Sequence, residues 1–215
     1  MYLSKVDINP ARRSARYLLA SPQRLHAAVL AGFPPDEPLK GERGERVLWR
    51  IDRWQSAYRL YVVSPGKGDF THLAEQAGWP VAGCWATRNY EPVLRNLTLN
   101  QELRFRLTAN PTHSSSADAS GGRGKIYAHV TADQQLMWLK ERAPKCGIDL
   151  HQVNVVARDQ VDFRRGKQRV TLARATYEGI LRITDTGELR HTMVAGLGRA
   201  KAYGCGLLTL AALGQ

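Results

Sequence analysis

The sequence predicts an α+β protein made of two tandem ferredoxin-like halves, and three observations predict it. Short stretches of alternating apolar and polar residues indicate strands in both halves of the chain. Segments with helical spacing separate these strands, so that the first half reads strand, helix, strand, strand, helix. A similar order follows in the second half, and 215 residues are enough for two small domains. We therefore expect one domain over residues 1–95 and another over residues 96–215.

The first half supplies all but the last strand of a ferredoxin-like unit. Residues 2–8 alternate as a strand does, and Asn9-Pro10 ends them. Ser21 and Pro22 provide an N-cap and a first-turn proline for a helix, which ends before Pro34-Pro35. Between the strand and this helix we expect a basic loop that contains Arg12, Arg13 and Arg16. The remaining expected elements are two strands and a helix, at residues 47–52, 58–63 and 69–77.

The second half begins with a strand at residues 99–109, where Leu103, Phe105 and Leu107 alternate with charged side chains. Residues 110–125 are rich in Ser, Gly, Ala and Asn, so we expect a mobile loop there. An amphipathic helix follows at residues 131–145. The later expected elements are strands at 150–158, 168–172 and 175–183, a helix at 186–195, and a closing strand at 206–211.

The charge of the chain favours a polyanionic partner. The formal net charge is +12, and each phosphate that a cation neutralises releases counterions and so adds affinity. No unbroken apolar run approaches the roughly 20 residues that a membrane-spanning helix needs, and the N-terminus lacks the apolar region of a signal peptide. The three cysteines are far apart, which argues against a disulfide framework or a cysteine-rich zinc site. We expect a cytoplasmic protein that binds nucleic acid and no membrane.

A glycine-rich segment, GLGRAKAYGCG, follows the last expected helix at residues 196–206. Gly196 and Gly198 permit a close backbone approach, so peptide N–H groups there can meet phosphate oxygens, while Arg199 and Lys201 neutralise them. The segment does not match the Walker pattern, and no nucleotide cofactor is expected. The alternative is a simple helix C-cap followed by a turn.

A second basic feature lies at residues 158–174, where cations crowd a turn centred on Gly166. Two strand-like stretches flank this turn, which predicts a basic β-hairpin. Such a hairpin can enter a groove of an RNA helix and contact its phosphates. The alternative is a solvated tip whose charges only oppose aggregation. The cations of this hairpin are Arg158, Arg164, Arg165, Lys167 and Arg169.

His26 is the candidate for proton transfer among six histidines. It lies on the first expected helix beside Arg24, and histidine is the side chain best matched to proton transfer near neutral pH. A single histidine on a helix is more often structural. No metal-binding motif occurs in the sequence, so no metal is expected.

Several separated stretches of the chain resemble the CasE family, the precursor-RNA endoribonucleases of the CRISPR type I-E Cascade complex. The resemblance spans both ends and the middle of the chain, and it is weakest between residues 34 and 100. The stretches are MYLSKVDINP at 1–10, SPQRLH at 21–26, LRFRLTANP at 103–111, ATYEGILRITD at 175–185, and GLGRAKAYGCGLLTLA ending at 212.

This resemblance implies tandem ferredoxin-like domains of the RRM-like, repeat-associated class. It also implies cleavage within a CRISPR repeat RNA, at the base of its stem-loop, with no metal and no cofactor. The 2′-hydroxyl beside the scissile phosphate would attack it, leaving a 2′,3′-cyclic phosphate and a 5′-hydroxyl. The product would be retained together with the other Cascade subunits.

The catalytic histidine of the family falls on His26, although its role as acid or base stays open. Some relatives carry a tyrosine where this chain has Gln23, so a hydrogen bond from Gln23, or a movement of Tyr17, is needed to replace the phenol. Arg24 and Arg16 are expected to stabilise the charge on the phosphorane. The basic hairpin corresponds to residues 164–169 and the glycine loop to 196–206. Two alternatives stay open, a noncatalytic RNA-binding subunit and a nucleotide-dependent enzyme that uses the glycine segment.

Overall fold

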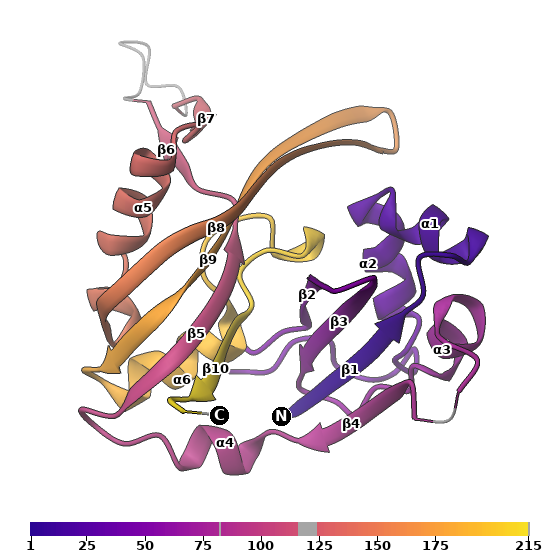
Figure 1. The fold of residues 1–215 in the computed structure, drawn as a ribbon, viewed down its shortest axis with the longest axis horizontal. Helices are drawn as coiled ribbons and strands as arrows, with labels where there is room; N and C mark the ends of the chain where they lie inside the picture. The colour runs from indigo at the N-terminus through magenta and orange to yellow at the C-terminus, as the bar shows by residue number, and fades with distance from the viewer. Residues whose placement is uncertain (82, 116–123, 215) are drawn as a thin grey trace.

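Two four-stranded antiparallel sheets form the framework of the protein (Figure 1). The computed structural model describes residues 1–81, 83–115 and 124–214. One sheet is built from the first half of the chain and the other from the second half. Each half has the same strand order, which confirms the expected α+β fold of two ferredoxin-like units.

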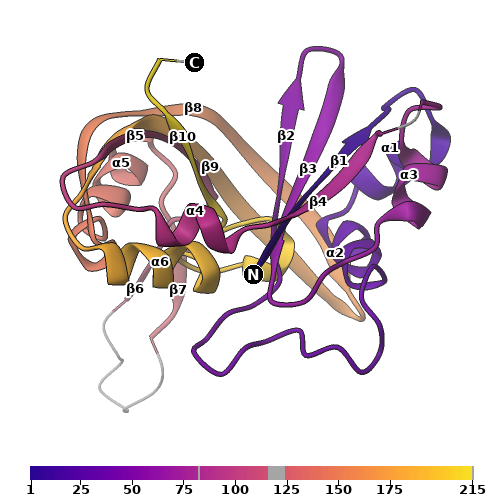
Figure 2. The same cartoon turned by 90° about the horizontal axis from the view of Figure 1, so that it is seen from below.

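The first sheet has the order β4-β1-β3-β2, and it contains the final strand that the sequence did not predict. The helices of this half lie on the side of the sheet that faces away from the second half (Figure 2). The elements are β1 (Tyr2–Ile8), α1 (Arg13–Leu19), α2 (Pro22–Leu30), β2 (Leu48–Trp54), β3 (Ala57–Ser64), α3 (Thr71–Ala77) and β4 (Trp85–Asn89).

The prediction of a basic loop after the first strand is wrong, because most of that segment forms the short helix α1. This helix buries Ala15 and Leu18 against the first sheet, and its N-cap residue, Arg12, makes no side-chain capping bond. Helix α2 begins as predicted, with Pro22 in its first turn, although the side chain of Ser21 makes no capping hydrogen bond. Packing rather than capping therefore determines both helices.

The second sheet has the order β10-β5-β9-β8. Counting only the strands of this sheet along the chain, they lie in the order fourth, first, third, second, which is the order of the first sheet. A short helix, α4 (Glu91–Arg95), connects the two halves. The other elements are β5 (Glu102–Ala109), β6 (Thr112–Ser114), β7 (Ile126–Ala128), α5 (Ala132–Lys140), η1 (Pro144–Cys146), β8 (Ile148–Arg165), β9 (Gln168–Ile183), α6 (Thr186–Ala195), η2 (Lys201–Tyr203) and β10 (Leu208–Ala212).

Strands β8 and β9 form one long hairpin in place of the three shorter strands expected here. The hairpin extends well beyond the sheet, toward helices α1 and α2 (Figure 1). Its turn contains Gly166, with φ 58°. Strand β6 lies within the expected mobile loop at 110–125 and pairs with β7, which begins just after it, whereas residues 116–123 lie outside the described part of the chain.

Alternating residues of β2 and β3 belong to two different hydrophobic cores, one in each half of the protein. Trp49 and Val62 face the helices of the first half, whereas Leu48 and Val63 join the core of the second half. Because neighbouring residues of a strand point to opposite faces, this sheet is buried on both sides here. The two halves therefore share a continuous apolar interface.

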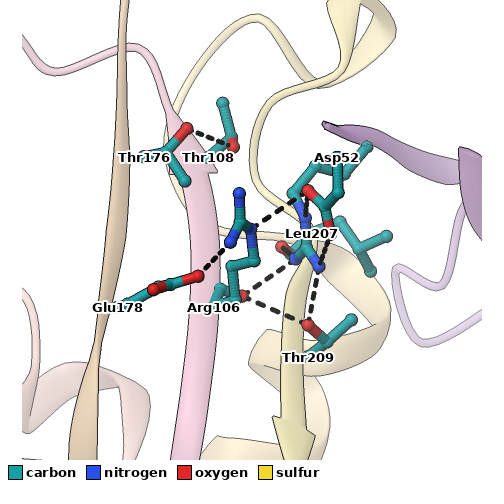
Figure 3. Close-up of polar contacts among 8 residues, drawn as sticks. Asp52, Arg106, Thr108, Thr176, Glu178, Leu207 and Thr209 are labelled. Carbon is teal, nitrogen blue, oxygen red and sulfur yellow. Dashed lines mark hydrogen bonds and ion pairs between the residues drawn. The ribbon is translucent and has the colours of Figure 1, made fainter. Parts of the chain in front are cut away.

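A buried arginine crosses this interface. Arg50 of β2 is only 2% exposed, and its guanidinium donates to the carbonyl oxygens of Arg106 at 2.9 Å and Leu207 at 3.0 Å. It also makes two hydrogen bonds of 2.8 Å to the carboxylate of Asp52. Thr209 accepts a further bond, and Arg106 pairs with both Asp52 and Glu178 (Figure 3). These bonds join the first half to strands β5 and β10.

Candidate functional site

Helix α2 places His26 at the junction between the two halves. The indole Nε1 of Trp49, on β2, donates a hydrogen bond to Nδ1 of His26 over 3.3 Å. The ring of Tyr203, on η2, meets the imidazole edge-on with their centroids 6.4 Å apart. The neutral imidazole with its acceptor on Nδ1 carries its proton on Nε2, so Nε2–H is the group left free to act.

Burial lowers the pKa of His26, because a half-buried imidazolium loses hydration. The hydrogen bond from Trp49 also lowers the pKa of His26. Protonation of Nδ1 would place two N–H groups, that of the imidazolium and that of the indole, against each other. His26 is therefore neutral at pH 7, with a fixed tautomer.

His26 opens into a surface pocket of about 730 Å³. Three segments that are distant in the sequence meet there: helix α2, the tip of the β8–β9 hairpin and the glycine-rich segment. The pocket thus brings together several residues singled out from the sequence, which are Gln23, His26, Arg165, Gly198, Arg199 and Lys201.

The pocket is strongly cationic. Arg46, which precedes β2, lines it together with Arg165, Arg199 and Lys201. Burial and the nearby Arg46 guanidinium lower the pKa of the Lys201 ammonium, whose Nζ donates to the carbonyl of Ala195 at 2.8 Å. Arg165 and Arg199 are exposed. Such a concentration of positive charge favours an anionic ligand such as a phosphodiester.

The glycines of the 196–206 segment are required by close packing. Gly196 and Gly204 have φ of 78° and 79°, a region that favours glycine. A Cβ on Gly196 would lie 2.7 Å from Leu48, and one on Gly204 would lie 2.7 Å from Trp49. Gly196 also ends helix α6, as the C-cap alternative predicted. The segment therefore packs against strand β2 while it lines the pocket of His26.

The hairpin is anchored beside the same pocket. Phe163, near its tip, is 7% exposed and packs edge-on against Tyr203 with a centroid distance of 4.7 Å. Tyr203 therefore contacts both the hairpin and His26. The cations at the tip remain exposed to solvent, and they are Arg164, Arg165, Lys167 and Arg169.

Other predicted site residues lie apart from this pocket. The Arg24 guanidinium stacks over the ring of Tyr17 at 3.9 Å, and Arg16 donates to the carbonyl of Ala11 at 2.7 Å. Tyr17 lines a separate surface depression with Arg12 and Arg13. Arg158, at the base of the hairpin, donates to the carbonyl of Val130. The structure does not bring these side chains to His26.

Within residues 1–81, 83–115 and 124–214, no group of three or more His, Cys, Asp or Glu side chains is placed to hold a metal ion. No helix in the described part of the chain is long and apolar enough to cross a membrane.

A family model described as "CRISPR associated protein" matches residues 1–212. The chain belongs to this family. As a member, it is 29% identical to the CRISPR-associated endoribonuclease Cse3 of Thermus thermophilus, over 98% of this chain and 100% of that protein. It is 28% identical to the Cascade subunit CasE of Escherichia coli, over 99% of this chain and 100% of that protein.

The fold of this family member is also similar to solved structures. A structure of Cse3 bound to a 19-nucleotide RNA matches with a TM-score of 0.80 and 28% identity, covering 98% of this chain and 100% of that one. The resemblance to the CasE family that the sequence motifs suggested is thereby confirmed.

Sequence reasoning missed three residues around His26. Trp49 and Arg46 lie in or beside a strand that was predicted without any functional role, and only the fold brings them to α2. Tyr203 lies inside the glycine-rich segment, between Lys201 and Gly204, so its position was visible in the sequence. An aromatic residue between glycines and cations is the signal that could have identified it.

Proposed function

We propose that this chain is an endoribonuclease that cuts a CRISPR repeat RNA at the base of its stem-loop and keeps the product as a subunit of Cascade. The observation that carries the proposal is the cationic pocket in which His26 meets the hairpin tip and the glycine-rich segment. Family membership supports it, because the relatives include an endoribonuclease, Cse3, and a Cascade subunit, CasE.

The proposed reaction needs no group beyond the RNA, this chain and solvent water. The 2′-oxygen forms a bond to phosphorus while the bond from phosphorus to the 5′-oxygen breaks, which leaves a 2′,3′-cyclic phosphate and a 5′-hydroxyl. Solvent water takes the proton of the 2′-hydroxyl, and the 5′-oxygen takes a proton from solvent water. Holding the attacking oxygen in line with the leaving oxygen supplies much of the rate.

His26 is assigned to the leaving-group side. The bond from Trp49 occupies Nδ1, so Nε2–H is the free ring donor, and its hydrogen bond would stabilise the charge that develops on the 5′-oxygen or on a phosphate oxygen without transfer of the Nε2 proton. Arg165, Arg199 and Lys201 would stabilise the charge of the phosphorane. Gln23 would contribute a hydrogen bond from its amide, because it lines the same pocket.

The outer basic residues are assigned to the RNA backbone. Arg164, Lys167 and Arg169 would hold the stem, while Gly196 and Gly198 shape the loop beneath it. Arg12, Arg13 and Arg158 would add phosphate contacts. Arg16, Tyr17 and Arg24 would act in catalysis only after a rearrangement, because Arg24 is stacked on Tyr17.

The domain assignment belongs to the same proposal. Residues 1–95 would form the domain that carries His26, and residues 96–215 the domain that carries the hairpin and the glycine-rich segment. The proposed place of action is the cytoplasm, where this chain would bind the transcript and the other Cascade subunits.

The deciding experiment incubates the protein with its repeat RNA in EDTA. We expect one discrete cut, a 2′,3′-cyclic phosphate end, and a loss of about 10²- to 10⁴-fold in cleavage rate for His26→Ala with stem binding retained. The other candidate, a noncatalytic RNA-binding subunit, is favoured by Gln23 alone. Bound but intact RNA with the wild-type protein would support that candidate and overturn the endoribonuclease.

A further inference from the structure

A second pocket, which we call the inter-sheet pocket, lies between the two halves beneath the base of the hairpin. It has a volume of about 400 Å³, within the range of small-molecule sites. Strands β2 and β3 of the first half and strands β5, β8 and β9 of the second half line it. The residues that matter for its chemistry are Trp49, Arg53, Tyr58, Arg106, Arg158 and Arg174.

Two of its four arginines are already neutralised. Arg174 donates from Nε to Asp159 at 2.9 Å, and Arg106 pairs with Asp52 and Glu178. Arg158 points to the opposite face of β8 from Asp159, and its guanidinium donates to the carbonyl of Val130, so its charge is directed away from the pocket. Arg53 is exposed, and no carboxylate in the described part of the chain forms an ion pair with it. The pocket therefore has an excess positive charge that suits one phosphate group.

An aromatic ring lies beside Arg53, the free cation of the pocket. Tyr58 is half-buried and is the direct cross-strand partner of Arg53 in the β2–β3 pair, so both side chains point to the same face of the sheet. A base can stack on the exposed part of a tyrosine ring while an adjacent arginine holds the phosphate. An aromatic ring and an unpaired cation in one pocket match a nucleotide.

The inter-sheet pocket is adjacent to the pocket of His26. Trp49 lines the inter-sheet pocket and donates to His26, while Leu25, also in its wall, precedes His26 on α2. Gly204 lines the inter-sheet pocket, and its neighbour Tyr203 lines the pocket of His26. These shared neighbours place the two pockets side by side, so consecutive parts of one RNA strand can occupy both.

We propose that the inter-sheet pocket binds one unpaired nucleotide of the RNA strand that flanks the scissile phosphate. Its phosphate lies on Arg53, and its base lies on Tyr58. The inference rests on the proposed function, because it assumes that RNA occupies the pocket of His26. It adds a site for single-stranded RNA to the one that holds the stem.

The test uses uncleavable RNA, so that binding is measured apart from cleavage. Repeat RNAs carry a 2′-deoxy sugar before the scissile phosphate and end either at the stem or with unpaired nucleotides on the 5′ or 3′ side. Each unpaired position is replaced in turn by fluorescent 2-aminopurine. We expect one position to strengthen binding about tenfold and to lose fluorescence when bound, as a stacked base does.

Variants then locate that nucleotide. Arg53→Ala and Tyr58→Ala should each remove most of the tenfold gain and leave the affinity for the stem alone unchanged. Arg88→Ala is the matched control, because Arg88 is an exposed arginine on β4 and lines neither pocket. It should keep the full gain. Circular dichroism checks that each variant is folded.

Three outcomes overturn the inference: no flanking position improves binding, Arg53→Ala weakens stem and flanked RNA equally, or a free mononucleotide binds the pocket as tightly as the flanked RNA. Failure of the proposed function gives a different result, namely that cleavable RNA stays intact whatever its flanks. Because the binding gain is measured on uncleavable RNA, the two failures are distinguishable.

Discussion

Trp49 holds His26 by a hydrogen bond of 3.3 Å from its indole Nε1 to the imidazole Nδ1. The bond joins strand β2 to helix α2 and fixes which nitrogen faces the pocket. Trp49 is also the residue against which Gly204 packs. One buried side chain therefore connects the candidate catalytic histidine to the glycine-rich segment.

Replacing Trp49 by Phe should raise the pKa of His26. The phenylalanine keeps an aromatic ring but removes the N–H that opposes protonation of Nδ1, so the pKa moves up toward its ordinary value. NMR titration of the His26 ring protons measures the change. Cleavage at pH 8 should slow about tenfold because the ring is no longer held in place. An unchanged pKa would show that the indole does not control the imidazole.

Tyr203 should act through its ring. Its ring contacts both Phe163 and His26, so Tyr203→Phe should cleave at close to the wild-type rate. Tyr203→Ala removes both contacts, and we expect cleavage to slow by about tenfold or more while the stem still binds. Single-turnover cleavage and a gel-shift titration measure the two effects. A Phe variant as slow as His26→Ala would instead place the phenol in the chemistry.

Local signals were enough to predict much of the fold. Strand β1 and helix α6 have the predicted ends, because alternation is clean in the first and Asp185 caps the second. Helix α1 has no such cap, and strand β4 is a short segment of five residues. The sequence predicted shorter strands in place of the long hairpin. Beyond residue 155 most of β8 is exposed on both faces, so apolar and polar residues do not alternate clearly there.

The site was predictable only in part. His26, the hairpin and the glycine-rich segment each carry a local pattern, whereas the meeting of Trp49 with α2 depends on the packing of a whole sheet. Arg24 and Tyr17 are close to His26 in sequence, yet they pair with each other outside its pocket. Proximity in the sequence was a poor guide because Tyr17 lies on a different helix, α1, and because successive residues of α2 point in different directions.

Gly204→Ala should destabilise the protein by about 2–4 kcal/mol. A left-handed residue other than glycine costs about 1–2 kcal/mol, and the new Cβ would also lie 2.7 Å from Trp49. Gly83→Ala is the matched control, because Gly83 has φ 76° against 79° but has nothing within 4 Å of a Cβ. Urea unfolding of both variants measures the difference. Equal losses in the free energy of unfolding for the two variants would mean that Trp49 moves away from the new Cβ without an energetic cost.

Arg50→Met should destabilise the protein by about 3 kcal/mol or more. The methionine fills much of the space, but it leaves the carbonyl of Leu207 without its donor and Asp52 without its bidentate partner. Arg95→Met is the control, because Arg95 is 80% exposed and lies 3.9 Å from Glu91, a pair worth about 0–1 kcal/mol. Urea unfolding followed by circular dichroism compares the two variants with the wild type. A loss below about 1 kcal/mol in Arg50→Met would mean that apolar packing alone holds the two halves together, since the bonds from β2 to β5 and β10 would then add little.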